Sequence, residues 1–97
     1  MRNHATLFRP VDSGYQAVST SGTSAATTNA VGAQTYQVAL FCDQDVHIKF
    51  GQSPTATTSD FFLPASTMVF FPIAPGEKVA GIQSSAAGTL RVSELTT

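Results

Sequence analysis

Two segments in the middle of the chain alternate large apolar residues with small or polar ones. They are Tyr36-Gln-Val-Ala-Leu-Phe-Cys42 and Val46-His-Ile-Lys-Phe50, separated by Asp43-Gln-Asp45. A period of two places successive side chains on opposite faces, as a β-strand with one buried and one exposed face requires. Further short runs of strand-forming residues follow up to Leu95. So many short strands in so few residues favour a closed β-structure, in which function depends on shape and surface.

Turn-forming residues divide this region into short strands. Besides 36–42 and 45–50, the expected strands are 61–63, 68–73, 78–83 and 89–95, with weaker candidates at 15–21 and near 27–31. Pro64 and the Pro75-Gly76 dipeptide mark breaks between them. The Asp43-Gln44 turn between two alternating runs is typical of a β-hairpin. No segment places apolar residues at helical spacing over three turns, so we expect no long helix.

Seven or eight short strands predict an all-β fold, an antiparallel β-sandwich of jelly-roll type, with an up-and-down barrel as the second fold considered. The length of 97 residues suits one domain with a modest core. Residues 1–14 have few apolar residues beyond Leu7 and Phe8, so we expect an extended N-terminal arm that orders against a partner. Residues 15–97 are expected to form the single sandwich domain. The expected core is Val38, Leu40, Val46, Ile48, Phe50, Leu63, Phe70, Val79, Ile82, Leu90 and Val92.

Charged residues are scarce. Five basic and six acidic residues make up 11% of the chain and give a formal net charge of −1, whereas soluble domains usually contain roughly 25% charged residues. The basic residues are scattered rather than clustered, which argues against nucleic acid as a partner. The longest apolar run, Met68 to Ala74, is much shorter than the ~20 residues that cross a membrane. With no signal-peptide core after Met1, we expect synthesis in a cytoplasm and no membrane partner.

Few side chains are suited to metal binding or redox chemistry. Cys42 is the only cysteine, so an intrachain disulfide is excluded and a buried thiol is expected. His47 is expected on the outward phase of its strand. Asp43 and Asp45 flank one turn and are candidate calcium ligands, but turns favour Asp for local hydrogen bonds. We therefore predict no metal site and no cofactor.

Catalytic and sugar-binding patterns are also weak. Asp60 and Glu77 are carboxylates of the kind a glycosidase uses, but nothing in the sequence places them together. No phosphate-binding loop, nucleophile elbow or Cys-x-x-Cys motif occurs. A sugar-binding platform needs exposed Trp or Tyr; the chain has no Trp, and Tyr15 and Tyr36 lie in expected strands. The sequence therefore predicts a protein that is not an enzyme.

The phenylalanines indicate a contact surface. In the neighbouring pairs Phe61-Phe62 and Phe70-Phe71, strand alternation points one ring of each pair away from the core. Phe41 is likewise out of phase with its apolar neighbours. Both faces can be covered at the ends and edges of a sandwich, which is the alternative explanation. Since exposed apolar patches tend to mark interfaces, the expected interface residues are Leu7, Phe8, Phe41, Phe62 and Phe71.

Several short motifs within residues 36–95 resemble a recurrent type of small tailed-bacteriophage protein. They are Val46-His-Ile-Lys-Phe-Gly51, Ala56-Thr-Thr-Ser-Asp60, Leu63-Pro-Ala65, Pro75-Gly-Glu-Lys-Val-Ala80-Gly-Ile82 and Gly88-Thr-Leu-Arg-Val92. The resemblance implies a β-sandwich that is a structural component of the virion. Proteins of this type include capsid cement or decoration proteins. The resemblance carries over no site residues.

From this resemblance we expect a decoration protein that forms a homo-oligomer, a dimer or trimer, and stabilises the head by binding the major capsid protein. The alternatives are a tail or head–tail connector component, or a small carbohydrate- or receptor-binding module.

Overall fold

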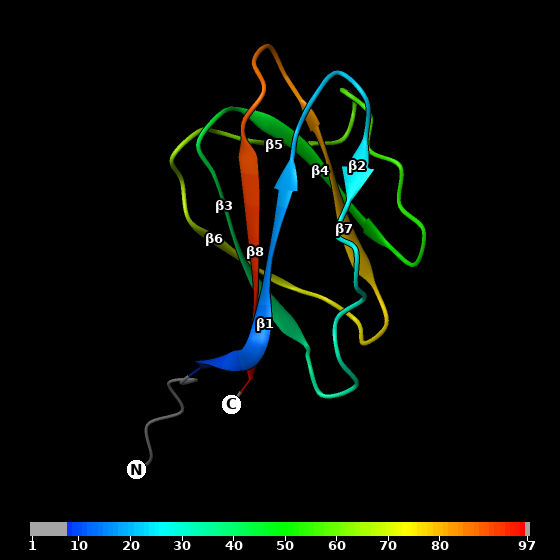
Figure 1. The fold of residues 1–97 in the computed structure, drawn as a ribbon, viewed down its shortest axis with the longest axis vertical. Helices are drawn as coiled ribbons and strands as arrows, with labels where there is room; N and C mark the ends of the chain where they lie inside the picture. Colours follow the sequence, from blue (N-terminus) through cyan, green and yellow to red (C-terminus); the bar gives the residue numbers. More distant parts are fainter. Residues whose placement is uncertain (1–7, 97) are drawn as a thin grey trace.

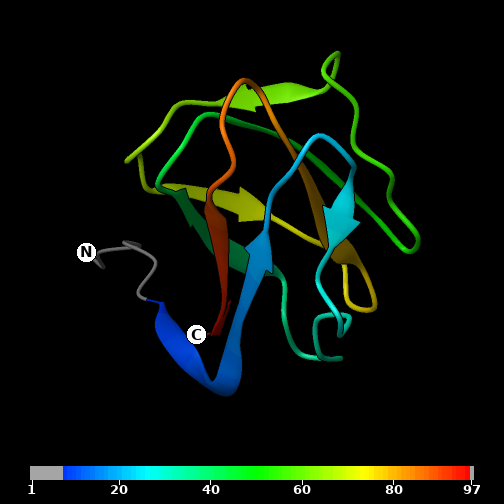
Figure 2. The ribbon, with the colours of Figure 1, turned by 45° about the horizontal axis from the view of Figure 1, so that its top comes forward.

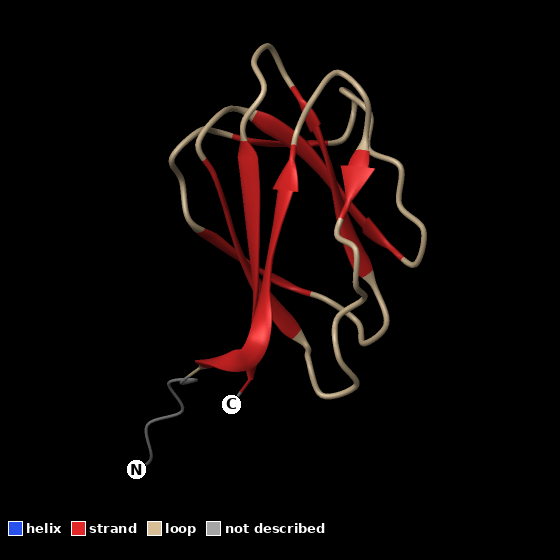
Figure 3. Cartoon of the chain, viewed as in Figure 1, coloured by secondary structure: helices blue, strands red, loops and turns tan. Residues whose placement is uncertain are grey.

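The computed structural model describes residues 8–96. These residues form eight strands: β1 (Arg9–Ser19), β2 (Ala25–Ala26), β3 (Gln37–Cys42), β4 (Val46–Gly51), β5 (Phe61–Leu63), β6 (Val69–Pro72), β7 (Lys78–Gln83) and β8 (Thr89–Thr96). Figures 1 and 3 show strands and loops only. No helix long and apolar enough to cross a membrane occurs in this part of the chain.

The strands pack as two four-stranded antiparallel sheets (Figure 2). The strand orders are β1-β8-β3-β6 and β2-β7-β4-β5. Each connection crosses from one sheet to the other, except the one between β4 and β5. This interleaved order is that of a jelly roll, in which the two sheets face each other over one core. The predicted all-β, jelly-roll-like sandwich is confirmed.

The hairpin expected between residues 36–42 and 45–50 is wrong. β3 pairs with β6 and β8, whereas β4 pairs with β5 and β7 in the other sheet. The turn between them is tied to neighbouring loops, because the Asp43 carboxylate accepts a hydrogen bond from the Thr89 amide and that of Asp45 accepts one from the Ala65 amide, both 2.8 Å long. The turn therefore connects the two sheets instead of closing a hairpin within one sheet.

The core lies between the sheets and matches most of its predicted members. Eight of them are at most 2% exposed: Val38, Leu40, Val46, Ile48, Leu63, Val79, Leu90 and Val92. Phe50 is half-buried and packs against them. The prediction that Phe70 and Ile82 lie in the core is wrong. Both side chains face outward, because their partners in the sheets, Ala39 and His47, face outward. The core also contains Val18, Val31 and Ile73, which were not predicted, and Cys42, whose thiol was expected to be buried.

The first strand begins well before the expected boundary at residue 14. Arg9 pairs with Thr96 and Pro10 with Leu95, and a bulge separates them from the next pair, Tyr15 with Ser93. Gly14 is buried at this bulge, where an added Cβ would lie 2.9 Å from the Val11 Cβ. Residues 9–14 therefore belong to the sheet, since β8 satisfies part of their backbone hydrogen bonding. The remainder of the expected arm, residues 1–7, lies outside the described residues.

Cys42 is fully buried at the end of β3, and burial raises the pKa of its thiol. Because the thiolate is the reactive form, we expect the native protein to resist labelling by a disulfide reagent at pH 8. Unfolding in guanidinium chloride should release one reactive thiol per chain. Rapid stoichiometric labelling without denaturant would contradict the buried position.

Candidate interaction surface

The outer face of the β1-β8-β3-β6 sheet is mostly apolar. Residues paired across antiparallel strands point to the same side, so the register defines this surface, which we call the β8 face. Its strand residues include Tyr15, Ala17, Gln37, Ala39, Phe41, Phe70, Arg91 and Ser93. Met68, just before β6, lines a groove on the same face. Arg91 is the only charged residue among these.

A groove of about 340 Å³ crosses the β8 face. The register places Tyr15, Ser93, Ala39 and Phe70 in one row across the four strands. Because the two middle residues are small and the outer two are aromatic, the row is hollow at its centre. The groove is lined by Tyr15, Ala39, Phe41, Met68, Arg91 and Ser93.

The polar part of the groove is formed by two lining side chains that are hydrogen-bonded to each other. The Arg91 guanidinium donates a hydrogen bond from Nη1 to the Tyr15 hydroxyl. Arg91 and Tyr15 are both exposed, and they come from adjacent strands. This contact gives one side of the apolar groove a fixed positive charge.

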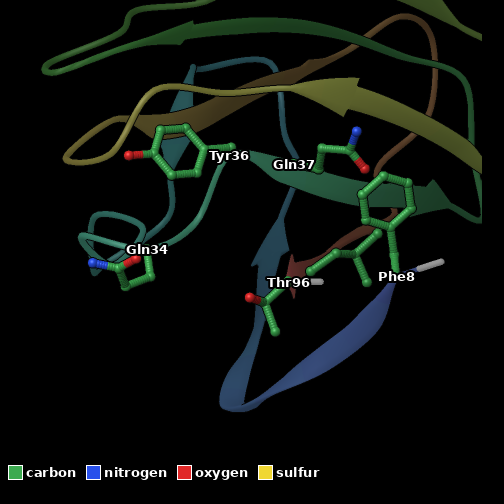
Figure 4. A pocket seen from close by; sticks show the side chains of 6 residues that line it. Phe8, Gln34, Tyr36, Gln37 and Thr96 are labelled. Carbon is green, nitrogen blue, oxygen red and sulfur yellow. The ribbon is translucent and has the colours of Figure 1, made fainter. Parts of the chain in front are cut away.

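A smaller cavity of about 60 Å³ lies at the end of the sheet where β1 begins. It is lined by Phe8, Gln34, Tyr36, Gln37, Leu95 and Thr96. Figure 4 shows Phe8 on one side of this cavity, with Tyr36 and Gln34 on the opposite side. The cavity adds two exposed aromatic rings to the end of the β8 face.

Exposed large hydrophobic residues are concentrated at these two hollows. Seven such residues occur in the described chain, and five of them lie on the β8 face or line the small cavity: Phe8, Tyr15, Tyr36, Met68 and Phe70. The other two, Phe61 and Phe62, lie on β5. Contiguous exposed apolar residues mark interaction surfaces, so the β8 face is the candidate functional site.

The predicted interface residues do not lie together. Phe41 is half-buried in the groove, and Phe8 lines the small cavity. Phe62 is exposed on the outer face of the other sheet, with its ring 5.4 Å from that of His47, which faces outward as expected. Phe71 points between the sheets, where its ring contacts those of Phe50 and Phe61. Leu7 lies outside the described residues.

The carboxylates considered as metal ligands or catalysts each accept a hydrogen bond from a backbone amide. Besides Asp43 and Asp45, Asp60 accepts a hydrogen bond from the Thr57 amide at 2.7 Å and Glu77 one from the Ala74 amide at 3.0 Å. Each of these last two carboxylates caps its own turn. Among residues 8–96, no three His, Cys, Asp or Glu side chains gather as a metal site.

Sequence reasoning missed most of the groove. Tyr15 and Tyr36 were not expected to form a sugar-binding platform, because they lie in expected strands. Their side chains are nevertheless 51% and 61% exposed. The alternation of β8 did contain a signal, since Arg91 and Ser93 are out of phase with Leu90 and Val92. Which residues flank them on the outer face depends on pairing between distant strands.

Comparison of the chain with protein-family models, with curated proteins and with solved structures gives no match.

Proposed function

We propose that this protein is a structural component of a tailed-phage virion, a decoration protein that self-associates and binds the major capsid protein. The observation that carries the proposal is the β8 face, where exposed apolar residues surround a groove on one sheet. The scarcity of charge in the chain supports it as well, because a domain that stays apart in solution usually carries more. Jelly rolls recur in viral capsid domains, which adds support by analogy alone.

The proposal includes the absence of enzymatic activity. In support, the carboxylates of Asp60 and Glu77 each accept a hydrogen bond from the backbone of their own turn. The Cys42 thiol is buried, and the one described contact of the His47 ring nitrogens is with the Asp60 carbonyl oxygen. A virion role needs none of these groups to react.

Burial of apolar surface is the physical basis of the proposed role. A shell filled with DNA is under outward load, and a small domain that bridges neighbouring subunits holds them together. Apolar surface removed from water contributes about 25 cal/mol per Å² before the costs of association. A stable contact needs roughly 800 Å² on each partner, so the β8 face is expected to act together with the small cavity beside it.

The test is binding to purified virions and their resistance to heat. We expect the protein to co-sediment with particles, to localise to heads in immunoelectron microscopy, and to raise the temperature at which DNA is released. Met68→Asp on the β8 face should weaken binding at least tenfold, because it places a charge in an apolar contact. Ser85→Asp, in the exposed loop before β8, is the matched control and should bind normally. Labelling confined to tails would instead support a tail or connector component.

The predicted interface role of Phe62 is tested alongside, by Phe62→Asp on the opposite sheet. This ring is exposed, so we expect the variant to fold and to lose self-association in sedimentation velocity. A strictly monomeric native protein that is absent from virions would contradict the proposed function.

A carbohydrate- or receptor-binding module is the second candidate. It is favoured by the exposure of Tyr15 and Tyr36, since exposed aromatic rings are the platforms on which sugars stack. Retention on a polysaccharide column, lost in Tyr15→Ala, would support this function. Failure to bind any glycan, with binding to capsids retained, would support the decoration protein.

A further inference from the structure

The groove on the β8 face combines apolar walls with a shallow floor of small residues. Phe41 and Met68 supply apolar side chains, and Ala39 and Ser93 leave space at the centre. A volume of about 340 Å³ admits protruding side chains of a partner segment rather than a whole structural element. The shape therefore favours an apolar side chain as part of whatever occupies it.

The polar groups that line the groove are mainly donors. A guanidinium has five N–H donors and no acceptor, and the hydrogen bond from Arg91 to Tyr15 occupies one of them. Because the Tyr15 oxygen accepts that bond, its own proton is left to donate elsewhere. Arg91 and Tyr15 therefore offer several donors and one positive charge to the occupant. Their chemical complement is an anionic acceptor, and a carboxylate matches a guanidinium in both charge and geometry.

The distribution of charge makes a second copy of this chain a poor occupant. The charged side chains on the outer faces of the two sheets are basic: Arg91 on one, and Lys49 and Lys78 on the other. The acidic residues of the described chain lie in turns or at the β1 bulge, apart from Glu94, which is buried. Stacking either face of one copy on the β8 face of another would bring like charges together. Face-to-face stacking of two copies therefore supplies no carboxylate to Arg91, which favours a different protein as the occupant.

We propose that the groove binds a partner-protein segment in which a carboxylate stands next to an apolar side chain. The apolar side chain enters between Phe41 and Met68, and the carboxylate accepts hydrogen bonds from Arg91 and Tyr15. This inference rests on the proposed function, because it gives the chemistry by which the capsid protein would be recognised.

The experiment uses the full chain and three peptides: acetyl-Thr-Leu-Glu-Leu-Thr-amide and its versions with Gln or Lys in place of Glu. Amide chemical shifts of Ala39, Arg91 and Ser93 report binding in the groove. We expect the Glu peptide to bind about fivefold more tightly than the Gln peptide and the Lys peptide to bind least. Raising the salt concentration should reduce the Glu preference, because the charged groups are exposed.

Variants distinguish the contribution of the polar side of the groove to binding from that of its apolar side. Arg91→Gln should abolish the preference for Glu over Gln, whereas Arg91→Lys should retain part of it because the charge remains. Met68→Ala should weaken all three peptides alike. Lys49→Gln removes a cation from the opposite sheet and is the matched control, so it should leave the preference unchanged.

The proposal is overturned if the shift changes map outside the groove, if the Lys peptide binds as well as the Glu peptide, or if Arg91→Gln keeps the preference. The salt dependence of the native protein's preference for the Glu peptide also tests the role of charge, without any variant. A groove that selects Glu in a protein that does not bind virions would contradict the proposed function alone. A protein that binds virions without selecting Glu would contradict this inference alone.

Discussion

Replacement of Phe71 by Asp is expected to destabilise the fold rather than to weaken a contact with a partner. The Phe71 ring packs between the sheets, with ring centroids 5.5 Å from Phe50 and 5.4 Å from Phe61. The substitution removes both aromatic contacts and places a carboxylate against the apolar core. We expect a loss of roughly 2–4 kcal/mol, a large part of the 5–15 kcal/mol that stabilises most domains. Urea denaturation followed by circular dichroism measures the loss.

Phe70→Asp is the matched control, since it makes the same chemical change one residue earlier. Phe70 points outward and is 63% exposed, so this variant should lose less than about 1 kcal/mol of stability. It should instead weaken binding through the β8 face. Equal stability of the two variants, or a native-like Phe71→Asp variant that fails only in binding, would show that the assigned strand phase is wrong.

Glu94→Ala is expected to destabilise the protein by about 3 kcal/mol. Glu94 is only 8% exposed, and its Oε1 atom accepts hydrogen bonds from the Thr35 hydroxyl at 2.6 Å and the Gly32 amide at 3.0 Å. These bonds fasten the β2–β3 loop to β8. Removing the carboxylate leaves both donors without this acceptor and opens a cavity. A loss of this size corresponds to roughly 12–24 °C in the melting temperature of a domain of this length.

Two further variants show whether the hydrogen bonds carry this effect. Glu94→Gln keeps an acceptor oxygen in place, so it should lose less stability than Glu94→Ala. Glu77→Ala removes a carboxylate that accepts one hydrogen bond in a half-buried turn and should cost about 1 kcal/mol. If Glu94→Ala melted within a few degrees of the native protein, the loop would not depend on this carboxylate.

The buried carboxylate also illustrates what a period-two pattern cannot reveal. Glu94 has the same phase in β8 as Leu90 and Val92, so its direction into the sandwich follows from the sequence. Whether a buried position accepts a charged residue depends on the donors that a distant loop brings to it. Gly32 and Thr35 lie about sixty residues away in the chain, and no local pattern connects them with Glu94.

By itself, the sequence determined the all-β class, most strand positions and most of the core. These are local properties, because strand alternation and turn residues depend on neighbours in the chain. The sequence also predicted correctly which side the residues of β3 and β4 face, since Val38, Leu40, Val46 and Ile48 are all buried.

Only the tertiary structure decided which strands pair, and therefore where the candidate site lies. A crossing connection and a hairpin can begin with the same turn residues, as at Asp43 and Gln44, and the choice depends on long-range contacts with Thr89 and Ala65. The groove follows from that choice, because pairing brings residues from β1, β8 and β3 together around a hollow on one face. In runs such as Val69–Pro72, both phases carry an aromatic residue, so alternation alone could not distinguish the outward Phe70 from the inward Phe71.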